Sequence, residues 1–195
     1  MTEMTGTMTG TRRDTSGFAL AAGVAGAAAN VLLILFFASG EAWRDVPGQL
    51  AWTGPVNDVL VAVQFAALVP VAVALGGRVA VAGVAAMAGV VVLQALLLAD
   101  VLEFETQVWW VTGCFVFVFA WVLLVSRGLP RTLRRCGTVV GAGYLAGALL
   151  VWGALALPSE SAGQYAVGGI GVVLGAIGWL GLPVWSLLLA RGSRR

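Results

Sequence analysis

Six long apolar segments follow one another along the chain, separated by short polar connections. Each segment has about the 20 residues that a helix needs to cross the ~30 Å hydrocarbon core of a bilayer. The pattern therefore predicts an all-α integral membrane protein, a six-transmembrane-helix bundle that occupies residues 17–190. The predicted spans are residues 17–38, 56–75, 79–99, 108–125, 137–157 and 165–190.

The segments outside these spans are polar. Residues 1–16 are rich in threonine and have no hydrophobic period, which predicts a disordered tail. Residues 191–195 form a short basic tail. The connection between the first two spans contains Trp43 and Trp52 but no long apolar run, which favours a short helix lying at the membrane interface.

Composition agrees with a membrane protein and removes several kinds of chemistry. The chain is 60% hydrophobic and 10% charged, whereas a soluble domain carries about 25% charged residues. Every basic residue is arginine, and histidine is absent, so imidazole metal sites, serine–histidine triads and lysine Schiff bases are excluded. We expect no metal, no cofactor and no nucleic-acid partner, with membrane lipids as the surroundings. Arginine with abundant alanine, glycine and valine is typical of bacterial proteins from GC-rich genomes.

The charges predict the orientation. With the N-terminus in the cytoplasm, ten of the eleven arginines fall on the cytoplasmic side and seven of the nine acids fall outside. Arginine and lysine in short connections favour the cytoplasmic face. The sequence therefore predicts a multi-pass protein of the bacterial inner membrane (the cytoplasmic membrane) with both termini in the cytoplasm.

Five amide side chains are the candidate ligand-binding residues. Asn30, Gln64 and Gln94 lie within three different spans, at a similar predicted depth in the outer half of the bilayer. A buried amide needs partners, so they are expected to face the bundle interior. Either they form a hydrogen-bonded clamp worth about 1 kcal/mol per contact, or they line a ligand cavity. Asn57 shares a helical face with Gln64, and Gln107 completes the set.

An acidic rim lies above these amides. Asp100, Glu103 and Gln107 fall at i, i+3 and i+7, which is one face if the helix continues. Asp58 stands at the start of the second span, where it can cap the helix. Alternatively, Asp58 pairs with Asp100 or Glu103 at the mouth of an outward-facing pocket. The topology of the protein in the membrane also explains the rim, because acidic residues are tolerated in connections on the outer side.

Small residues spaced four apart predict close helix packing. They occur at Gly137 and Gly141, Gly143 and Gly147, Gly171 and Gly175, and Ala85 and Gly89. Packing within the chain explains them, and a homodimer through the same faces is the alternative.

Two classes of function fit the sequence. The first is a protein that binds or transports a small molecule through an outward-facing polar pocket, or serves as a membrane accessory subunit. Pro70 and Pro183 kink two of its spans, as in carriers. The alternative is an intramembrane enzyme on a lipid or isoprenoid. By analogy with terpene cyclases, Asp58, Asp100 and Glu103 would be the catalytic acids and bases, and tryptophans would stabilise a carbocation.

Overall fold

The computed structural model describes residues 8–192, with side chains from Thr15 onward. Within this range the chain is helical, without strands, and contains six helices long and apolar enough to cross a membrane. This confirms the predicted class. The helices are α1 (Met8–Ala38), α2 (Thr53–Leu75), α3 (Arg78–Leu98), α4 (Phe104–Ser126), α5 (Arg131–Leu155) and α6 (Ala162–Gly192), with a 3₁₀ turn η1 (Glu41–Trp43) after α1.

Helix α1 begins before the apolar run. It starts at Met8, so residues 8–16, which were predicted to belong to the tail, continue the first helix. Once a helix exists, each further residue adds a backbone hydrogen bond, so helices extend past the segment that needs burial. Ser16 Oγ donates to the carbonyl oxygen of Ala190 at 3.0 Å, which ties this part of α1 to α6. The remaining predicted tail residues, 1–7 and 193–195, lie outside the described part.

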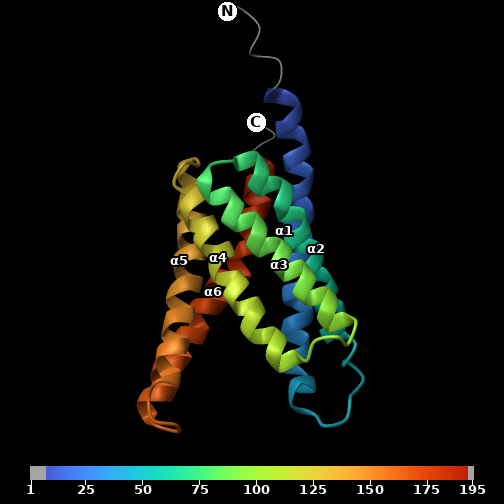
Figure 1. Cartoon of the computed structure of the whole chain (residues 1–195), viewed down its shortest axis with the longest axis vertical. Helices are drawn as coiled ribbons and strands as arrows, with labels where there is room; N and C mark the ends of the chain where they lie inside the picture. The colour runs from blue at the N-terminus through green and yellow to red at the C-terminus, as the bar shows by residue number, and fades with distance from the viewer. Residues whose placement is uncertain (1–7, 193–195) are drawn as a thin grey trace, which may run out of the picture.

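The six helices form a closed ring. Each helix packs on its neighbours in the sequence, and α6 packs on α1 (Figure 1). One end of the ring carries both chain termini and the α2–α3 and α4–α5 connections, and we call it the termini end. The other end carries the α1–α2, α3–α4 and α5–α6 connections, and we call it the loop end (Figure 1).

Glycines bring α5 and α6 into direct backbone contact. A Cβ added at Gly147 would meet the carbonyl oxygen of Gly171 at 2.6 Å and Cα of Gly175 at 2.7 Å. A Cβ at Gly178 would meet the backbone nitrogen of Tyr144 at 2.6 Å. These contacts make α5 and α6 a tightly packed hairpin.

The other small-residue motifs also serve contacts within the chain. A Cβ at Gly141 would meet the carbonyl oxygen of Phe119 on α4 at 2.8 Å, and one at Gly89 would meet Cys114 Sγ on α4 at 2.9 Å. Gly137 lies against Ser126, the last residue of α4. Intramolecular packing therefore accounts for these faces, and the homodimer stays a prediction.

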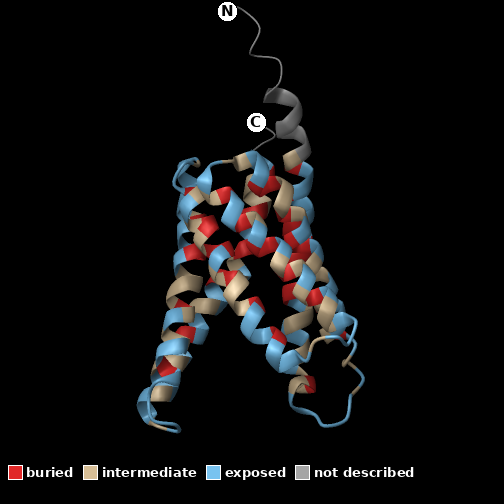
Figure 2. Ribbon diagram, viewed as in Figure 1, coloured by how far each residue is buried: buried red, intermediate tan, exposed pale blue. Residues whose placement is uncertain are grey.

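The α5–α6 hairpin is joined to the other four helices mainly in its half nearest the termini end. There, Trp185 contacts Trp121 of α4, and Leu187 lies against Gly23 of α1. Toward the loop end the hairpin diverges from α1–α4 (Figure 1). Large apolar side chains of this half, such as Leu149 and Val172, are exposed (Figure 2). In a bilayer, such side chains face lipid.

An aromatic cluster fills the ring near its middle. It joins four helices through Phe65, Phe115, Phe119, Tyr144 and Trp179. Phe119 and Tyr144 stack with ring centroids 4.0 Å apart, and Trp179 meets Phe115 edge-on at 4.7 Å. Such ring pairs add about 0.5–1.5 kcal/mol beyond their buried area. The cluster separates the termini-end half of the bundle from the loop-end half.

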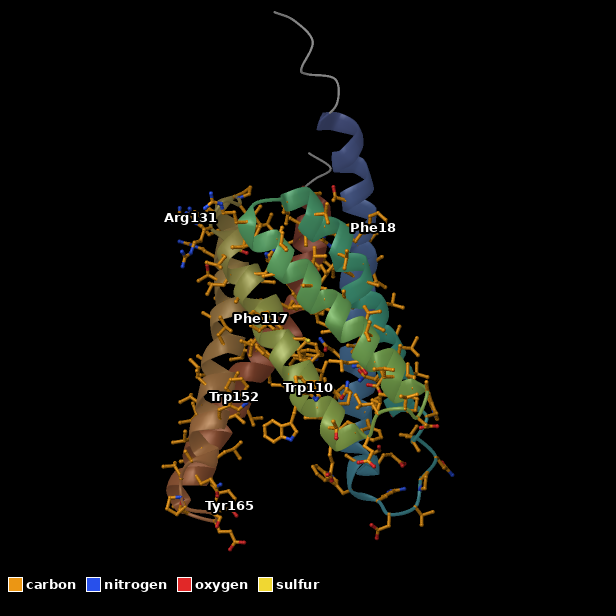
Figure 3. All side chains as sticks on the ribbon, in the orientation of Figure 1. Phe18, Trp110, Phe117, Arg131, Trp152 and Tyr165 are labelled. Carbon is orange, nitrogen blue, oxygen red and sulfur yellow. The ribbon has the colours of Figure 1, made fainter. Side chains whose placement is uncertain are left out.

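Charge is divided between the two ends. Among residues 15–192, the arginines at the termini end are Arg78, Arg127, Arg131, Arg134, Arg135 and Arg191, and Figure 3 labels Arg131 there. The loop end carries the acids Glu41, Asp45, Asp58, Asp100, Glu103, Glu105 and Glu160. Arg44, also at the loop end, is paired with Glu41.

Candidate functional site

Helix α2 begins earlier than the apolar pattern predicts, and this changes the role of Asp58. Thr53 is fully buried and its hydroxyl donates to the carbonyl oxygen of Leu50 at 2.7 Å, in the turn that starts the helix. Asp58 consequently lies in the second turn of α2, and the first turn contains no acid. The interpretation of Asp58 as a helix cap is therefore wrong.

Asn57 and Asp58 bring two hydrogen-bond acceptors together. Asn57 is 8% exposed, and its Nδ2 donates to Asp58 Oδ1 over a long 3.5 Å. Within the described residues, the buried Oδ1 of Asn57 has no hydrogen-bond partner, and the half-buried Asp58 forms no ion pair. A buried polar atom without a partner is costly and calls for an explanation. An amide oxygen without a partner, beside a carboxylate without an ion pair, favours a ligand that donates hydrogen bonds.

Gln64 extends the same face of α2 deeper into the bundle. It lies two turns below Asn57, about 10 Å along the helix, and is 3% exposed. Its amide fits between α2 and α1 because position 26 is glycine: a Cβ there would meet Gln64 Cδ at 2.5 Å. Asn30, one turn along α1 from Gly26, is also buried. Neither amide is hydrogen-bonded within the part of the chain that carries described side chains.

Gln94 and Gln107 form the interhelical clamp. Gln107 Nε2 on α4 donates to Gln94 Oε1 on α3 at 3.2 Å, and both side chains are buried. Gln94 lies about 6 Å from the loop end of α3, whereas Gln64 lies about 16 Å from the start of α2. The similar depth of Gln94 and Gln64 in a bilayer stays a prediction. Of the five amides, Gln94 and Gln107 are hydrogen-bonded to each other. Asn30, Asn57 and Gln64 are not bonded to another amide of the set.

The structure does not assemble the acidic rim as predicted. Helix α3 ends at Leu98, and Asp100 follows in the left-handed conformation, with φ 52°. Its N–H donates to the carbonyl oxygen of Leu97 at 3.0 Å, which closes the helix end. The helical face expected through Asp100, Glu103 and Gln107 is therefore interrupted. Asp100 and Glu103 are exposed, and within residues 15–192 neither is hydrogen-bonded to Asp58.

Glu41 is a buried acid that was not among the predicted site residues. Its carboxylate accepts hydrogen bonds from the backbone N–H groups of Gly48 at 2.8 Å and Leu50 at 3.3 Å. It also pairs with Arg44 at 3.4 Å. This one side chain therefore organises the connection that leads into α2, next to Asn57 and Asp58. The spacing of Glu41 and Arg44, three apart, was the available signal.

The site is thus the loop-end part of α2, with the paired acceptors of Asn57 and Asp58 above Gln64 and the aromatic ring of Phe65. Trp110 on α4 and Trp152 on α5 lie on the two sides of the hairpin divergence (Figure 3), and both are exposed. Among residues 8–192, no group of three histidine, cysteine or acidic side chains could hold a metal ion. No protein-family model, curated protein or solved structure matches the chain.

Proposed function

We propose that this protein binds a small molecule at its loop end, as a binding, carrier or accessory protein of the bacterial cytoplasmic membrane. The observation that carries the proposal is the buried Oδ1 of Asn57, which has no partner among the described side chains, beside the Asp58 carboxylate, which forms no ion pair there. Both groups accept hydrogen bonds. The ligand is therefore a molecule with a hydrogen-bond-donating head, such as an amine or a hydroxyl group.

The rest of the ligand is expected to be apolar. Below Asp58, the same face of α2 presents Val61 and then Gln64 and Phe65, which packs on Trp179. One amide followed by aromatic rings suits an amphipathic molecule whose body reaches toward the aromatic cluster. Among residues 15–192, charged residues other than Asp58 lie in the connections or near helix ends. Binding or facilitated movement therefore fits better than ion-driven transport, which normally uses a charged group near the midplane.

Removing the acceptors should weaken binding without unfolding the protein. Native mass spectrometry of protein released gently from its own membranes identifies the ligand mass, and the same compound is then titrated into the stripped protein. We expect Asp58→Asn to lower its affinity at least roughly tenfold, because a hydrogen bond to a charged group contributes about 1.5–3 kcal/mol. Asn57→Leu is expected to act in the same direction.

Two controls separate binding from structure. Asp45→Asn removes an exposed acid of the α1–α2 connection and should leave affinity unchanged. Gln94→Leu breaks the bond to Gln107 and should lower the melting temperature while leaving affinity unchanged. Two results together would refute the proposal. The protein would be released without any bound mass, and Asp58→Asn would have no effect on it.

The proposed orientation has both termini in the cytoplasm, with the loop end outside. The charge division supports it, since the arginines gather at the termini end. We expect a C-terminal green fluorescent protein fusion to fluoresce and a C-terminal alkaline phosphatase fusion to be inactive. Fusions truncated after Glu160 should show the reverse pattern. Active phosphatase at the C-terminus would invert the assignment.

The aromatic cluster also favours a second candidate, an enzyme acting on an isoprenoid. Aromatic rings stabilise carbocations, and Asp58 is the one proposed catalytic acid close to them along the chain. If the bound mass is an isoprenoid, Asp58→Asn should end its conversion to product while binding persists at reduced affinity. Unchanged product formation would remove this candidate.

A further inference from the structure

Among the residues with described side chains, three buried hydrogen-bond donors at the termini-end half of the bundle lack partners. They are the indole nitrogens of Trp121 and Trp185 and the hydroxyl of Ser126, and none of the three residues is more than 1% exposed. An unpaired buried donor costs about 1–3 kcal/mol. Such groups are therefore rarely left without an acceptor.

Ser126 and Trp185 face the same point on α5. Ser126 ends α4, Trp185 belongs to α6, and a Cβ added at Gly137 of α5 would meet both Ser126 Oγ and Trp185 Nε1, the latter at 2.8 Å. Gly137 therefore lets two donors from different helices approach the same point of the α5 backbone. The ring of Trp121 meets that of Trp185 edge-on at 5.8 Å and closes one side.

We propose that Ser126 Oγ and Trp185 Nε1 form a compact site for a single hydrogen-bond acceptor at the junction of α4, α5 and α6. An indole N–H only donates, and a hydroxyl can donate at the same time. The occupant is consequently an acceptor atom, and the complete burial of both residues limits it to a small species. A water oxygen and a chloride ion share this chemistry.

The surroundings of the site are compatible with a water molecule and with a chloride ion. Buried water typically makes two to four hydrogen bonds to groups that are otherwise unsatisfied. Arg127 follows Ser126 directly, and Arg131, Arg134 and Arg135 lie at the same end, so the local potential also favours an anion. Either occupant bridges α4 and α6 where the hairpin is held to the rest of the ring. The site is independent of the ligand proposed at the loop end.

The direction in which Ser126→Ala changes the melting temperature tests the proposal. If the Ser126 hydroxyl has no partner, Ser126→Ala removes a desolvated group and should raise the melting temperature. If it holds an acceptor, Ser126→Ala should lower the melting temperature by about 2–4 °C. Ser186→Ala is the matched control, because that buried hydroxyl already donates to the carbonyl oxygen of Leu182 at 2.9 Å within its own helix.

Indole resonances supply the second measurement. The full chain is labelled with ¹⁵N-tryptophan in lipid nanodiscs, and the Trp185 signal is assigned by its loss in Trp185→Phe. We expect its indole proton at a hydrogen-bonded chemical shift that moves in Ser126→Ala. An exchange cross-peak to water identifies a water oxygen, whereas a shift when bromide replaces chloride identifies an anion. A Trp185 resonance typical of an unbonded N–H, together with a raised melting temperature for Ser126→Ala, would overturn the proposal.

Discussion

Replacing Gly147 with leucine is expected to prevent α5 and α6 from packing as a hairpin. The added carbons would enter the backbone of α6, where Gly171 and Gly175 lie 2.6–2.7 Å from the position of a Cβ. Backbone atoms cannot rotate aside as side chains can. Since helices in lipid associate through close approach of this kind, we expect most of the leucine variant to be lost as aggregate in size-exclusion chromatography. Even Gly147→Ala should cost about 1–3 kcal/mol.

The same two helices provide matched controls. A Cβ at Gly153 on α5 or at Gly169 on α6 would have no neighbour within 4 Å. Gly153→Leu and Gly169→Leu should therefore elute and melt like the unmodified protein. If Gly147→Leu also does so, the α5–α6 contact described above is incorrect.

Replacing Glu41 with alanine is expected to open the connection between α1 and α2. The change removes the acceptor of two backbone N–H groups and the partner of Arg44. Hydrogen bonds to a charged group contribute about 1.5–3 kcal/mol, which corresponds to a roughly 10- to 100-fold faster amide exchange at Gly48 and Leu50. Hydrogen–deuterium exchange followed by mass spectrometry measures this directly.

A nearby acid separates this local effect from a change in net charge. Asp45 lies on the same connection and is exposed, so Asp45→Ala should leave the exchange rates unchanged. Glu41→Gln keeps the shape of the side chain but not its charge, and should give intermediate rates. Unaltered exchange in Glu41→Ala would contradict the role assigned to this carboxylate.

The spans themselves could be predicted because apolarity alone decides which segments enter a bilayer. Helix α3, Arg78–Leu98, differs from its predicted span by one residue at each end. The starts of α1 and α2 were harder, because polar residues such as Thr53 begin these helices. Hydrogen bonding in the first turn, which hydropathy does not report, fixes such starts.

The site could be predicted in part. The five candidate amides are all buried, as expected of polar groups in lipid. Their partners could not be predicted, since these depend on where each helix starts and how it is rotated. The left-handed turn at Asp100 is a similar case, because it redirects the chain and breaks a face that looked continuous in the sequence. The contact of Ser126 and Trp185 with Gly137 joins residues from three helices, and no local pattern in the sequence indicates it.

The ring also sets an order of assembly. During synthesis, α2 to α5 each find a packing partner as the next helix is inserted into the membrane. Helix α1 packs on α2 early, but its second neighbour in the ring, α6, is the last of the six helices to be synthesised. Until then the face of α1 that includes Gly23, where Leu187 will lie, is open to lipid or to another membrane protein. The contact between the first and the last helix of the ring therefore forms last.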